Sequence, residues 1–408
     1  MNPKSIIGKS ESSVALLTGG ADRPYAYGLS TALVSKGVTL DFIGSDDLDF
    51  PEFHGRPEVN FLNVHGVQRP GASFVKKITR HAACYGRLVF YAATAKPTIF
   101  HILWNNRFQF IDRTLLLLYY RLLRKQIVLT AHNVNQARRD GNDTRLNRAT
   151  LHAQYRLADH IFVHTEKMKL ELVEEFHVPP VRITVIPFGI NNSVPNTHLA
   201  PAEAKRKLGL REGKKALLFF GRIRPSKGLE YLIAAFRENL ARPDDYQLII
   251  AGRPDKCEEY WNAIQETIDD DVRRGRIVLR AENIPDDETE VYFKAADVLV
   301  LPYRDIFQSG VIFLGYNFGL PVLATDVGSL KDEIVEGKTG FVCKPEDPVS
   351  LASTIERYFG SDLYRELNSR RKEIRDYATK RHSWDVVSQM TIDVYDSLGS
   401  GRGAAAFA

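Results

Sequence analysis

The chain alternates between short apolar runs and longer amphipathic stretches. In its first half the apolar runs predict strands over residues 14–17, 38–43, 98–103, 127–130, 160–164 and 183–186. The stretches between them place apolar residues at helical spacing, most clearly over 27–35, 114–123 and 149–157. Continuous apolar runs are typical of strands buried on both faces, so the alternation predicts a parallel sheet with helices on both sides.

The same alternation begins again after residues 187–201, which are rich in Asn, Pro and Gly and which we interpret as a linker. Strands are predicted over 216–220, 246–251, 276–279, 298–301, 322–324 and 340–342, and helices over 350–359, 363–379 and 384–398. We therefore expect an α/β protein of two doubly wound, Rossmann-like domains, residues 1–190 and 191–380, that face each other across an interdomain cleft.

The composition agrees with a soluble globular protein. The chain has 408 residues, of which 44% are apolar and 26% charged, and it is too long for one ordinary core. Its three cysteines are scattered, which argues against a disulfide framework or a zinc cluster and fits a reducing cytosol. Residues 1–13 lack the apolar core of a signal peptide, and the apolar run 115–120 is too short to cross a bilayer. We expect a cytoplasmic protein.

The net charge of +5 conceals a strong asymmetry. Residues 59–139 contain thirteen Lys or Arg and one acid, Asp112, and a basic helix is predicted over 74–81. Such a lobe attracts anionic partners, so nucleic acid and an anionic membrane surface are both candidates, while a solvated helix face is the simpler alternative. We favour a peripheral contact with an anionic membrane and expect no nucleic acid.

The segment 217–228 carries the clearest candidate chemistry. A buried strand is followed by Gly221, by spaced cations that include Arg222 and Lys227, and then by an amphipathic helix over 229–240. Backbone N–H groups at such a turn favour an anion, and the two cations add full positive charge. The segment lacks the order of a Walker loop, yet it predicts a place that holds a phosphate or diphosphate and stabilises negative charge on it.

A polar residue directly after a predicted buried strand is a second candidate. His132 follows the strand 127–130, and side chains at that position point toward the ligand side of a doubly wound sheet. Asn133 is its neighbour. The segment 104–107, Trp-Asn-Asn-Arg, follows the strand 98–103 and is expected to line the first domain's side of the cleft as an acceptor contact, with core packing of Trp104 an equal alternative.

Several motifs in this order resemble family 4 glycosyltransferases, the retaining nucleotide-sugar enzymes with a GT-B fold. In that family an Arg and a Lys after the corresponding strand hold the donor diphosphate, and they match Arg222 and Lys227. A His that contacts the transferred sugar matches His132, and an N-terminal glycine turn near donor and acceptor matches Gly19 and Gly20. The resemblance runs over nearly the whole chain.

The resemblance continues over residues 300–325, where the family has its donor-binding signature, but with one departure. The family places two glutamates eight residues apart, and this chain has Ile306 and Leu314 there. In the family one of them holds the ribose and the other lies near the sugar. We expect the donor to be bound instead by Gly221 and by the segment Gln308, Ser309, Gly310 and Val311, whose turn before a helix offers N–H groups to phosphate.

The remaining polar clusters carry less weight. Asp47 and Asp49 are interpreted as solvated surface, and Glu333 as the cap of the next helix. His160 and His164 share one side of a predicted strand but lack partners at zinc spacing, so no metal site is expected.

The resemblance implies a retaining hexosyltransferase that uses UDP- or GDP-sugar, bound by the second domain, and a glycan or lipid-linked acceptor, bound by the first. It implies front-face substitution without a metal or other cofactor, in the assembly of a cell-surface polysaccharide. It also implies that the last helix, within residues 381–408, crosses back to the first domain. The small residues from Gly399 onward separately predict a disordered tail. The alternatives are a non-catalytic GT-B protein that binds a sugar or a partner glycosyltransferase, and a nucleic-acid-binding protein.

Overall fold

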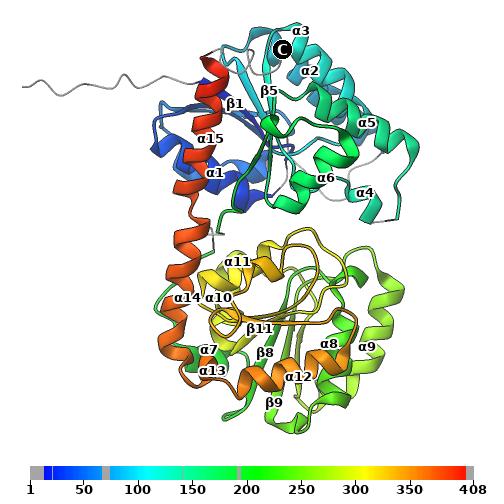
Figure 1. Cartoon of the computed structure of the whole chain (residues 1–408), viewed down its shortest axis with the longest axis vertical. Helices are drawn as coiled ribbons and strands as arrows, with labels where there is room; N and C mark the ends of the chain where they lie inside the picture. The colour runs from blue at the N-terminus through cyan, green and yellow to red at the C-terminus, as the bar shows by residue number, and fades with distance from the viewer. Residues whose placement is uncertain (1–12, 21, 67–73, 140, 191–193, 401–408) are drawn as a thin grey trace, which may run out of the picture. The chain divides into compact units, whose positions relative to one another are not determined.

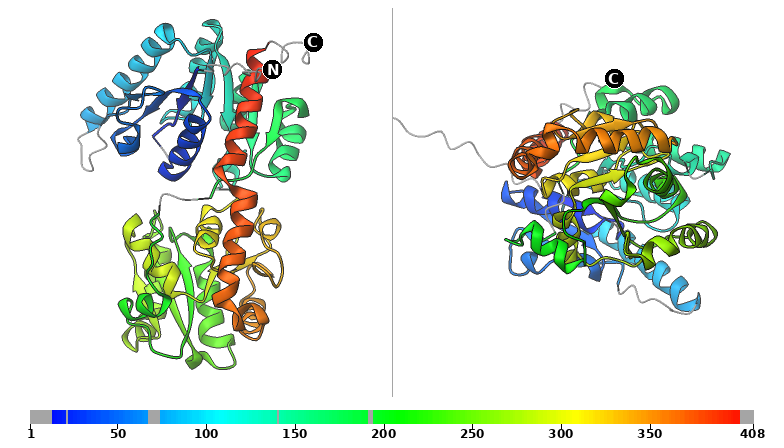
Figure 2. Two further views of the ribbon diagram at one scale, coloured as in Figure 1. Left: turned by 90° about the vertical axis from the view of Figure 1, so that its left-hand side faces the viewer. Right: turned by 90° about the horizontal axis from the view of Figure 1, so that it is seen from below.

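The computed structural model describes residues 13–400 except 21, 67–73, 140 and 191–193. The chain divides into two compact units. The first unit runs to Gly189 and resumes at Trp384, and the second comprises Ile190–Ser383. Each unit is a parallel sheet with helices on both faces (Figures 1 and 2).

The described sheet of the first unit has seven parallel strands in the order β3-β2-β1-β4-β5-β6-β7. The strands are β1 (Ser13–Leu17), β2 (Thr39–Gly44), β3 (Val59–Asn63), β4 (Ile99–Ile102), β5 (Gln126–Thr130), β6 (His160–Val163) and β7 (Ile183–Val185). The helices are α1 (Arg23–Ser35), α2 (Phe74–Thr94), α3 (Leu116–Leu122), α4 (Gln136–Arg139), α5 (Arg145–Leu157), α6 (Glu166–Phe176) and α15 (Trp384–Gly399).

One strand of this sheet was not predicted from the sequence. β3 lies at the sheet edge and pairs only with β2 among the described strands. Its residues, VNFLN, are exposed or half-buried, and two asparagines interrupt the apolar run. Edge position therefore explains why the apolar-run criterion overlooked it.

The C-terminal helix α15 completes the core of the first unit. Two glycines make room for its first residue, since a Cβ on Gly28 or Gly189 would lie 2.0 or 2.4 Å from atoms of the Trp384 ring. Near the other end of the helix, the Tyr395 hydroxyl lies 2.6 Å from Nδ1 of the buried His101 on β4. The predicted tail overlaps the helix at Gly399, and residues 401–408 lie outside the described residues.

The second unit repeats the architecture with six parallel strands in the order β10-β9-β8-β11-β12-β13. The strands are β8 (Lys215–Phe220), β9 (Tyr246–Ala251), β10 (Ile277–Arg280), β11 (Val298–Leu301), β12 (Val322–Thr325) and β13 (Gly340–Cys343). The helices are α7 (Pro201–Lys207), α8 (Leu229–Ala234), α9 (Glu258–Arg273), α10 (Asp286–Ala295), α11 (Gly310–Asn317), α12 (Pro348–Phe359), α13 (Asp362–Arg365) and α14 (Leu367–His382). The helix predicted over 229–240 is not α-helical throughout. The α-helix α8 ends at Ala234, and the chain continues as a π-helical turn, Ala235–Asn239.

Both sheets reverse their strand order at one place. In the first unit the chain adds β2 and β3 on one side of β1 and β4 on the other. In the second unit it adds β9 and β10 on one side of β8 and β11 on the other. Ligands of doubly wound sheets bind outside the carboxyl ends of the strands at this switch point. The loops after β1, β4, β8 and β11 are therefore where each unit offers a binding site.

Candidate functional site

The cationic turn predicted over 221–228 lies at the switch point of the second unit. Gly221 follows β8 with φ +109°, a conformation that favours glycine. Gly228 has φ +62°, and a Cβ there would lie 2.0 Å from the Pro302 carbonyl oxygen just after β11. Between them, Lys227 places its Nζ 3.8 Å from the centre of the Tyr303 ring. The turn and the end of β11 thus form one local structure around Lys227.

Arg222 is the more accessible cation of this turn. Its Nη1 lies 3.5 Å from Oδ2 of Asp255, and its side chain is 64% exposed. Asp255 has a closer partner in Arg224, whose Nε donates to the same oxygen at 2.9 Å. That hydrogen bond holds the pKa of Asp255 below its usual value. Because Arg224 already compensates Asp255, Arg222 is available to an anion above the strand end.

The loop after β11 brings the predicted donor-binding residues to the same place. Ser309 Oγ lies 3.3 Å from the Tyr303 hydroxyl, and Gly310 begins α11. Val311 lies beside Gly221, since a Cβ on that glycine would be 3.4 Å from Val311 Cγ2. The structure therefore gathers Gly221, Ser309 and Val311 around the position of Lys227.

Gln308 has a property that only the structure shows. Both its Oε1 and Nε2 atoms are buried, and neither has a hydrogen-bond partner among the described residues. Leaving a buried amide unpaired costs about 1–3 kcal/mol per polar group. Such a group at a binding loop points to a ligand as its missing partner.

Ile306 and Leu314, which stand where the resemblance would place glutamates, are both packed inside the unit. Their side chains are buried. A Cβ on Gly328 would lie 1.9 Å from the Ile306 carbonyl oxygen, so the loop after β12 presses against this backbone. The apolar residues fit their surroundings, because an unpaired carboxylate there would lose its hydration.

In the first unit, His132 follows β5 and lies in an aromatic cage. Its ring stacks on Trp104, with centroids 3.9 Å apart and planes 5° from parallel, and Tyr25 meets it edge-on at 4.6 Å. Trp104 is thus packed against the predicted sugar-contacting histidine. The sequence analysis missed Tyr25, because nothing in the pattern of α1 distinguishes it from an ordinary core residue.

A second histidine sets the hydrogen-bonding role of His132. His164 Nδ1 lies 3.3 Å from the carbonyl oxygen of Ile186, and its Nε2 lies 3.0 Å from His132 Nδ1. A carbonyl accepts only, so we assign the His164 proton to Nδ1 and leave its Nε2 as an acceptor. His132 Nδ1 then donates, and its Nε2 carries a lone pair. That atom is buried and has no partner among the described residues.

Both histidines are kept neutral. Burial, reinforced by His164 and His101, lowers the pKa of His132 well below its usual 6.5. Burial lowers the pKa of His164 to about 4. His132 Nε2 is therefore a hydrogen-bond acceptor at neutral pH, suited to a sugar hydroxyl and unsuited to stabilising an anion.

The glycine turn after β1 supports this cage. Gly19 has φ +60°, and a Cβ there would lie 2.5 Å from the Trp104 carbonyl oxygen. The N–H of Gly20 donates to Thr18 Oγ1 at 3.2 Å. Asn133 is half-buried beside His132. Glycine at position 19 therefore allows the backbone of the loop after β1 to contact the backbone of the loop after β4.

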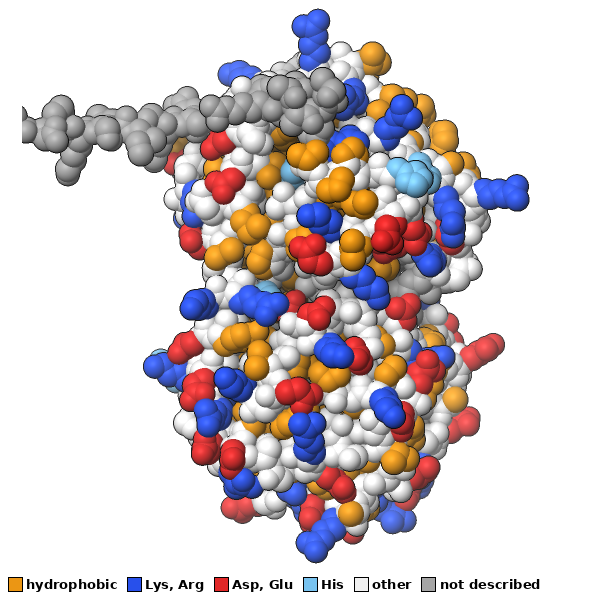
Figure 3. Space-filling view, in the orientation of Figure 1, with side chains coloured by type: hydrophobic (Ala, Val, Ile, Leu, Met, Phe, Trp, Pro, Cys, Tyr) orange, Lys and Arg blue, Asp and Glu red, His pale blue; other side chains and the backbone are white. Residues whose placement is uncertain are grey.

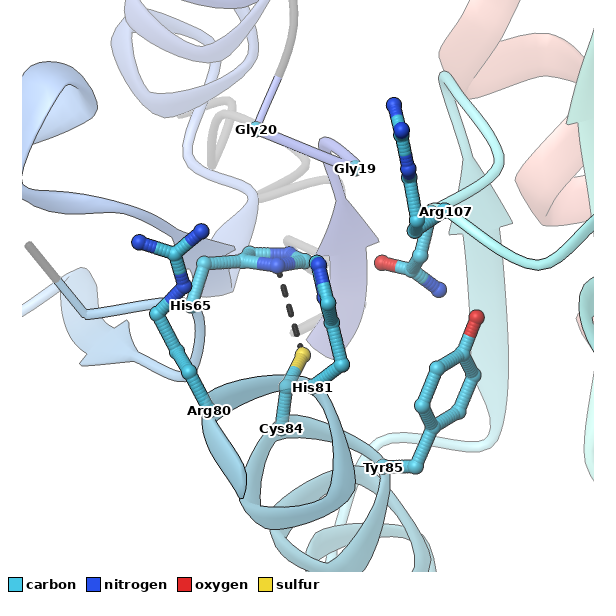
Figure 4. A pocket seen from close by; sticks show the side chains of 9 residues that line it. Gly19, Gly20, His65, Arg80, His81, Cys84, Tyr85 and Arg107 are labelled. Carbon is cyan, nitrogen blue, oxygen red and sulfur yellow. Dashed lines mark hydrogen bonds between the residues drawn. The ribbon is translucent and has the colours of Figure 1, made fainter. Parts of the chain in front are cut away.

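A cavity of about 410 Å³ opens beside the same glycines (Figure 4). It is lined by Gly19, Gly20, His65, Arg80, His81, Cys84, Tyr85, Asn106 and Arg107. Most of these residues did not stand out in the sequence, because they come from α2 and from loops after three different strands. Apart from the predicted glycine turn, their signals were the basic stretch and the segment 104–107, and the side chains at 74–77 lie outside the described residues.

The minor candidates have structural roles. Glu333 does not cap a helix as expected. It is buried in a 3-10 turn, with Oε2 3.1 Å from His382 Nε2. His160 Nε2 lies 2.9 Å from Thr184 Oγ1. Asp49 lies 2.7 Å from His54 Nε2 at the surface. In the described part of the chain, no group of three His, Cys, Asp or Glu residues is arranged to hold a metal ion.

Two family models match the chain, one for each half. Residues 18–194 match the model described as Glycosyltransferase Family 4, and residues 214–361 match the one described as Glycosyl transferases group 1. An uncharacterized glycosyltransferase of Methanocaldococcus jannaschii is 26% identical over 90% of this chain and 92% of its own length. The D-inositol 3-phosphate glycosyltransferase of Corynebacterium diphtheriae is 29% identical over 59% of this chain and 58% of its own length.

Solved structures agree on the fold. Sucrose-phosphate synthase from Thermosynechococcus elongatus has a TM-score of 0.73 at 20% identity, covering 96% of this chain and all of that chain. HepE of Anabaena in complex with UDP has a TM-score of 0.72 at 14% identity, covering 95% of this chain and all of that chain. With its two Rossmann-like sheets and both family models in order along the sequence, the chain belongs to the family 4-like glycosyltransferases with a GT-B fold.

Proposed function

We propose that the protein transfers a hexose from UDP- or GDP-sugar, with retention, to a glycan or lipid-linked acceptor in cell-surface polysaccharide synthesis. The observation that carries the proposal is the turn of Arg222 and Lys227 at the switch point of the second unit, with Lys227 held 3.8 Å from the Tyr303 ring centre. Two cations beside a turn whose glycines, Gly221 and Gly228, have positive φ values are suited to bind the negative charge of a nucleotide diphosphate.

The proposed reaction breaks the bond between the anomeric carbon and the diphosphate oxygen and forms one to the acceptor oxygen on the same face. The acceptor proton passes to the leaving diphosphate. Arg222 and Lys227 stabilise the charge that develops on this leaving group, so we propose that no metal is required. This route needs no carboxylate nucleophile, which fits the apolar Ile306 and Leu314.

Two further groups orient the substrates in this proposal. His132 Nε2, a neutral acceptor, takes a hydrogen bond from a hydroxyl of the sugar substrates, and the cage of Trp104 and Tyr25 fixes its ring. The Gln308 amide gains its missing partners from the donor. A group that gains hydrogen bonds only when a ligand is present favours the bound state.

Product analysis tests the proposal. The full chain is incubated with UDP- and GDP-hexoses and a panel of glycan and lipid-linked acceptors, and the anomeric configuration of the product is read by NMR. We expect transfer from one class of donor, with a product that keeps the anomeric configuration of the donor. We expect the same rate before and after chelation of divalent cations. An inverted product, a requirement for added metal, or binding without hydrolysis or transfer would contradict it. The last outcome would favour the non-catalytic alternative.

We also propose that the first unit contacts an anionic membrane through α2 and α3. Exposed apolar side chains gather on these helices, among them Phe90, 71% exposed, and Leu122, 81% exposed. The Tyr119 hydroxyl donates to the Val89 carbonyl oxygen, so the two helices lie side by side. Figure 3 shows apolar side chains gathered over this part of the molecule. None of the helices in the described residues has the length and apolar character to cross a bilayer.

The surrounding charge indicates which lipids would bind. Residues 59–139 carry thirteen Lys or Arg and one acid, and apolar side chains flanked by cations are typical of a surface that inserts shallowly into anionic lipid. Sedimentation with phosphatidylglycerol vesicles is expected to fail for Leu122→Ser and to persist for Leu170→Ser, an exposed leucine on α6. Equal binding of both variants, or equal binding to phosphatidylcholine, would remove this proposal.

A further inference from the structure

The cavity of the first unit lies where an acceptor would be expected to bind. Gly19 and Gly20 follow β1, His65 follows β3, and Asn106 and Arg107 follow β4, so the cavity spans the switch point at the carboxyl edge of the sheet. Helix α2 closes its other side. A volume of about 410 Å³ is within the range of small-molecule sites.

The lining of this cavity is positively charged. Arg80 and Arg107 stand on opposite sides of it, with the Gly19–Gly20 turn between them (Figure 4). His65 and His81 add two more nitrogen-bearing rings. Among the described lining residues none carries a carboxylate. Arginine forks bind phosphate in a bidentate manner, and glycine lets the backbone approach it closely.

Asp112 contacts two of the lining residues but is not itself part of the lining. Asp112 Oδ1 accepts hydrogen bonds from the Tyr85 hydroxyl and from Asn106 Nδ2, both at 2.9 Å. Asp112 is buried, and burial raises its pKa. It therefore positions Tyr85 and Asn106 and does not line the cavity beside the two arginines.

The arginines of the cavity affect the pKa of a neighbouring histidine. Partial burial, with Arg80 and Arg107, lowers the pKa of His81. His65 is held in place by Cys84, whose Sγ lies 3.3 Å from His65 Nδ1, and burial raises the pKa of that thiol to about 11. The two guanidinium groups and the two imidazole rings thus offer this polar cavity several nitrogen groups that can hydrogen-bond to an anion.

We propose that this cavity binds the acceptor and that the acceptor carries a phosphoryl group held between Arg80 and Arg107. The inference rests on the proposed transferase function and narrows its acceptor from any glycan or lipid-linked sugar to a phosphorylated one. The phosphoryl group belongs either to a soluble sugar phosphate or to the headgroup of a lipid.

Binding assays that do not depend on transfer test the proposal. Thermal shift and calorimetry on the full chain use inorganic phosphate, glucose 6-phosphate and glucose as probes. We expect the first two to bind and glucose to bind at least tenfold more weakly. Arg80→Gln and Arg107→Gln are each expected to weaken phosphate binding about tenfold to a hundredfold, since hydrogen bonds between charged groups are the strong ones. Vesicles with and without phosphatidic acid distinguish a lipid source from a soluble one.

The matched control is Arg87→Gln, because Arg87 is on the same helix but donates to the Val64 carbonyl oxygen and does not line the cavity. Equal loss in this control, or equal affinity for glucose and glucose 6-phosphate, would overturn the proposal. If an arginine-to-glutamine variant lowers the thermal midpoint of the free protein, Arg107→Lys replaces it, which keeps the charge and loses the fork. Hydrolysis of the donor in the absence of acceptor, measured in parallel, separates a failure here from a failure of the transferase function.

Discussion

His164 Nε2 lies 3.0 Å from His132 Nδ1, and this contact decides which nitrogen of His132 is left to accept a hydrogen bond. The His164 proton is directed to the Ile186 carbonyl oxygen, so the two histidines form a directed chain that ends at His132 Nε2. The arrangement makes His164 a positioning residue for its neighbour.

His164→Leu is expected to lower kcat/KM about twofold to tenfold, the loss that follows when one orienting hydrogen bond between neutral groups, worth about 0.5–1.5 kcal/mol, is removed. ¹⁵N NMR of the His132 ring checks the cause, because the variant is expected to lose the single Nδ1-protonated tautomer. His160→Gln is the control, since His160 lies at the start of β6 and bonds Thr184. An unchanged tautomer in His164→Leu would contradict the assignment.

Lys227→Met keeps the aliphatic stem beside Tyr303 and removes the charge. We expect kcat to fall about a hundredfold to a thousandfold, as when one group that stabilises a leaving anion is removed. Donor hydrolysis and transfer are measured together. Lys331→Met, which removes an exposed partner of Asp326, is expected to change neither. Loss of affinity without loss of kcat would show that Lys227 only binds.

Gln308→Met tests the unpaired amide. The variant is expected to stabilise the free protein by about 1 kcal/mol or more, because it removes buried polar atoms that lack partners. It is also expected to raise the KM for the donor. Unfolding in urea and initial rates measure the two effects. A stability loss instead of a gain would mean that the amide is satisfied in the free protein.

Gly19→Ala is expected to destabilise the first unit by more than 2 kcal/mol, because the new Cβ would lie 2.5 Å from a backbone oxygen at φ +60°. Gly55→Ala isolates the conformational part of this cost. Gly55 has φ +77° and nothing within 4 Å of an added Cβ, so a cost of about 1–2 kcal/mol is expected there. Equal costs at the two glycines would show that the loop after β4 moves aside.

The buried histidines predict acid sensitivity of the first unit. Burial lowers the pKa of His160 and of His164 to about 4, whereas the unfolded chain titrates near 6.5. The unfolded state binds more protons between these values, so the free energy of unfolding is constant above pH 6.5 and falls as the pH drops toward 4. Each histidine contributes at most about 1.4 kcal/mol per pH unit.

Tryptophan fluorescence of a Trp261→Phe background follows this transition, because the two remaining tryptophans, Trp104 and Trp384, are in the first unit. His160→Gln is expected to lower the slope of the free energy of unfolding against pH, because the variant no longer takes up one proton on unfolding. An identical slope in the variant would exclude His160 as a source of the acid sensitivity.

The sequence predicted the strands well where they are buried on both faces and poorly where they are not. Runs such as Tyr246–Ala251 are buried throughout and have the predicted bounds, whereas the half-buried edge strand β3 was missed. Local motifs such as the turn at Arg222 and Lys227 were also predictable, because their residues are adjacent in the chain.

Sites assembled from distant segments were not predictable in the same way. His132 was a candidate, but its bond to His164 joins residues 32 positions apart, and a single sequence carries no sign of it. Arg80 was noted only as part of a basic stretch, and Arg107 only as the last residue of the segment after the strand 98–103. Gln308 was expected to bind the donor, yet its unpaired amide is a fact of packing, which no local pattern encodes.

The slot that Gly28 and Gly189 form around Trp384 has a consequence for biosynthesis. The ring that fills this slot is translated almost two hundred residues after Gly189. During synthesis the second unit has all its residues first, while the first unit still lacks α15, including Tyr395, the partner of its buried His101. The usual order, in which N-terminal domains finish folding first, is therefore reversed. A chain that ends at Ser383 and has been released from the ribosome would hold a protease-resistant second unit and a protease-sensitive first one.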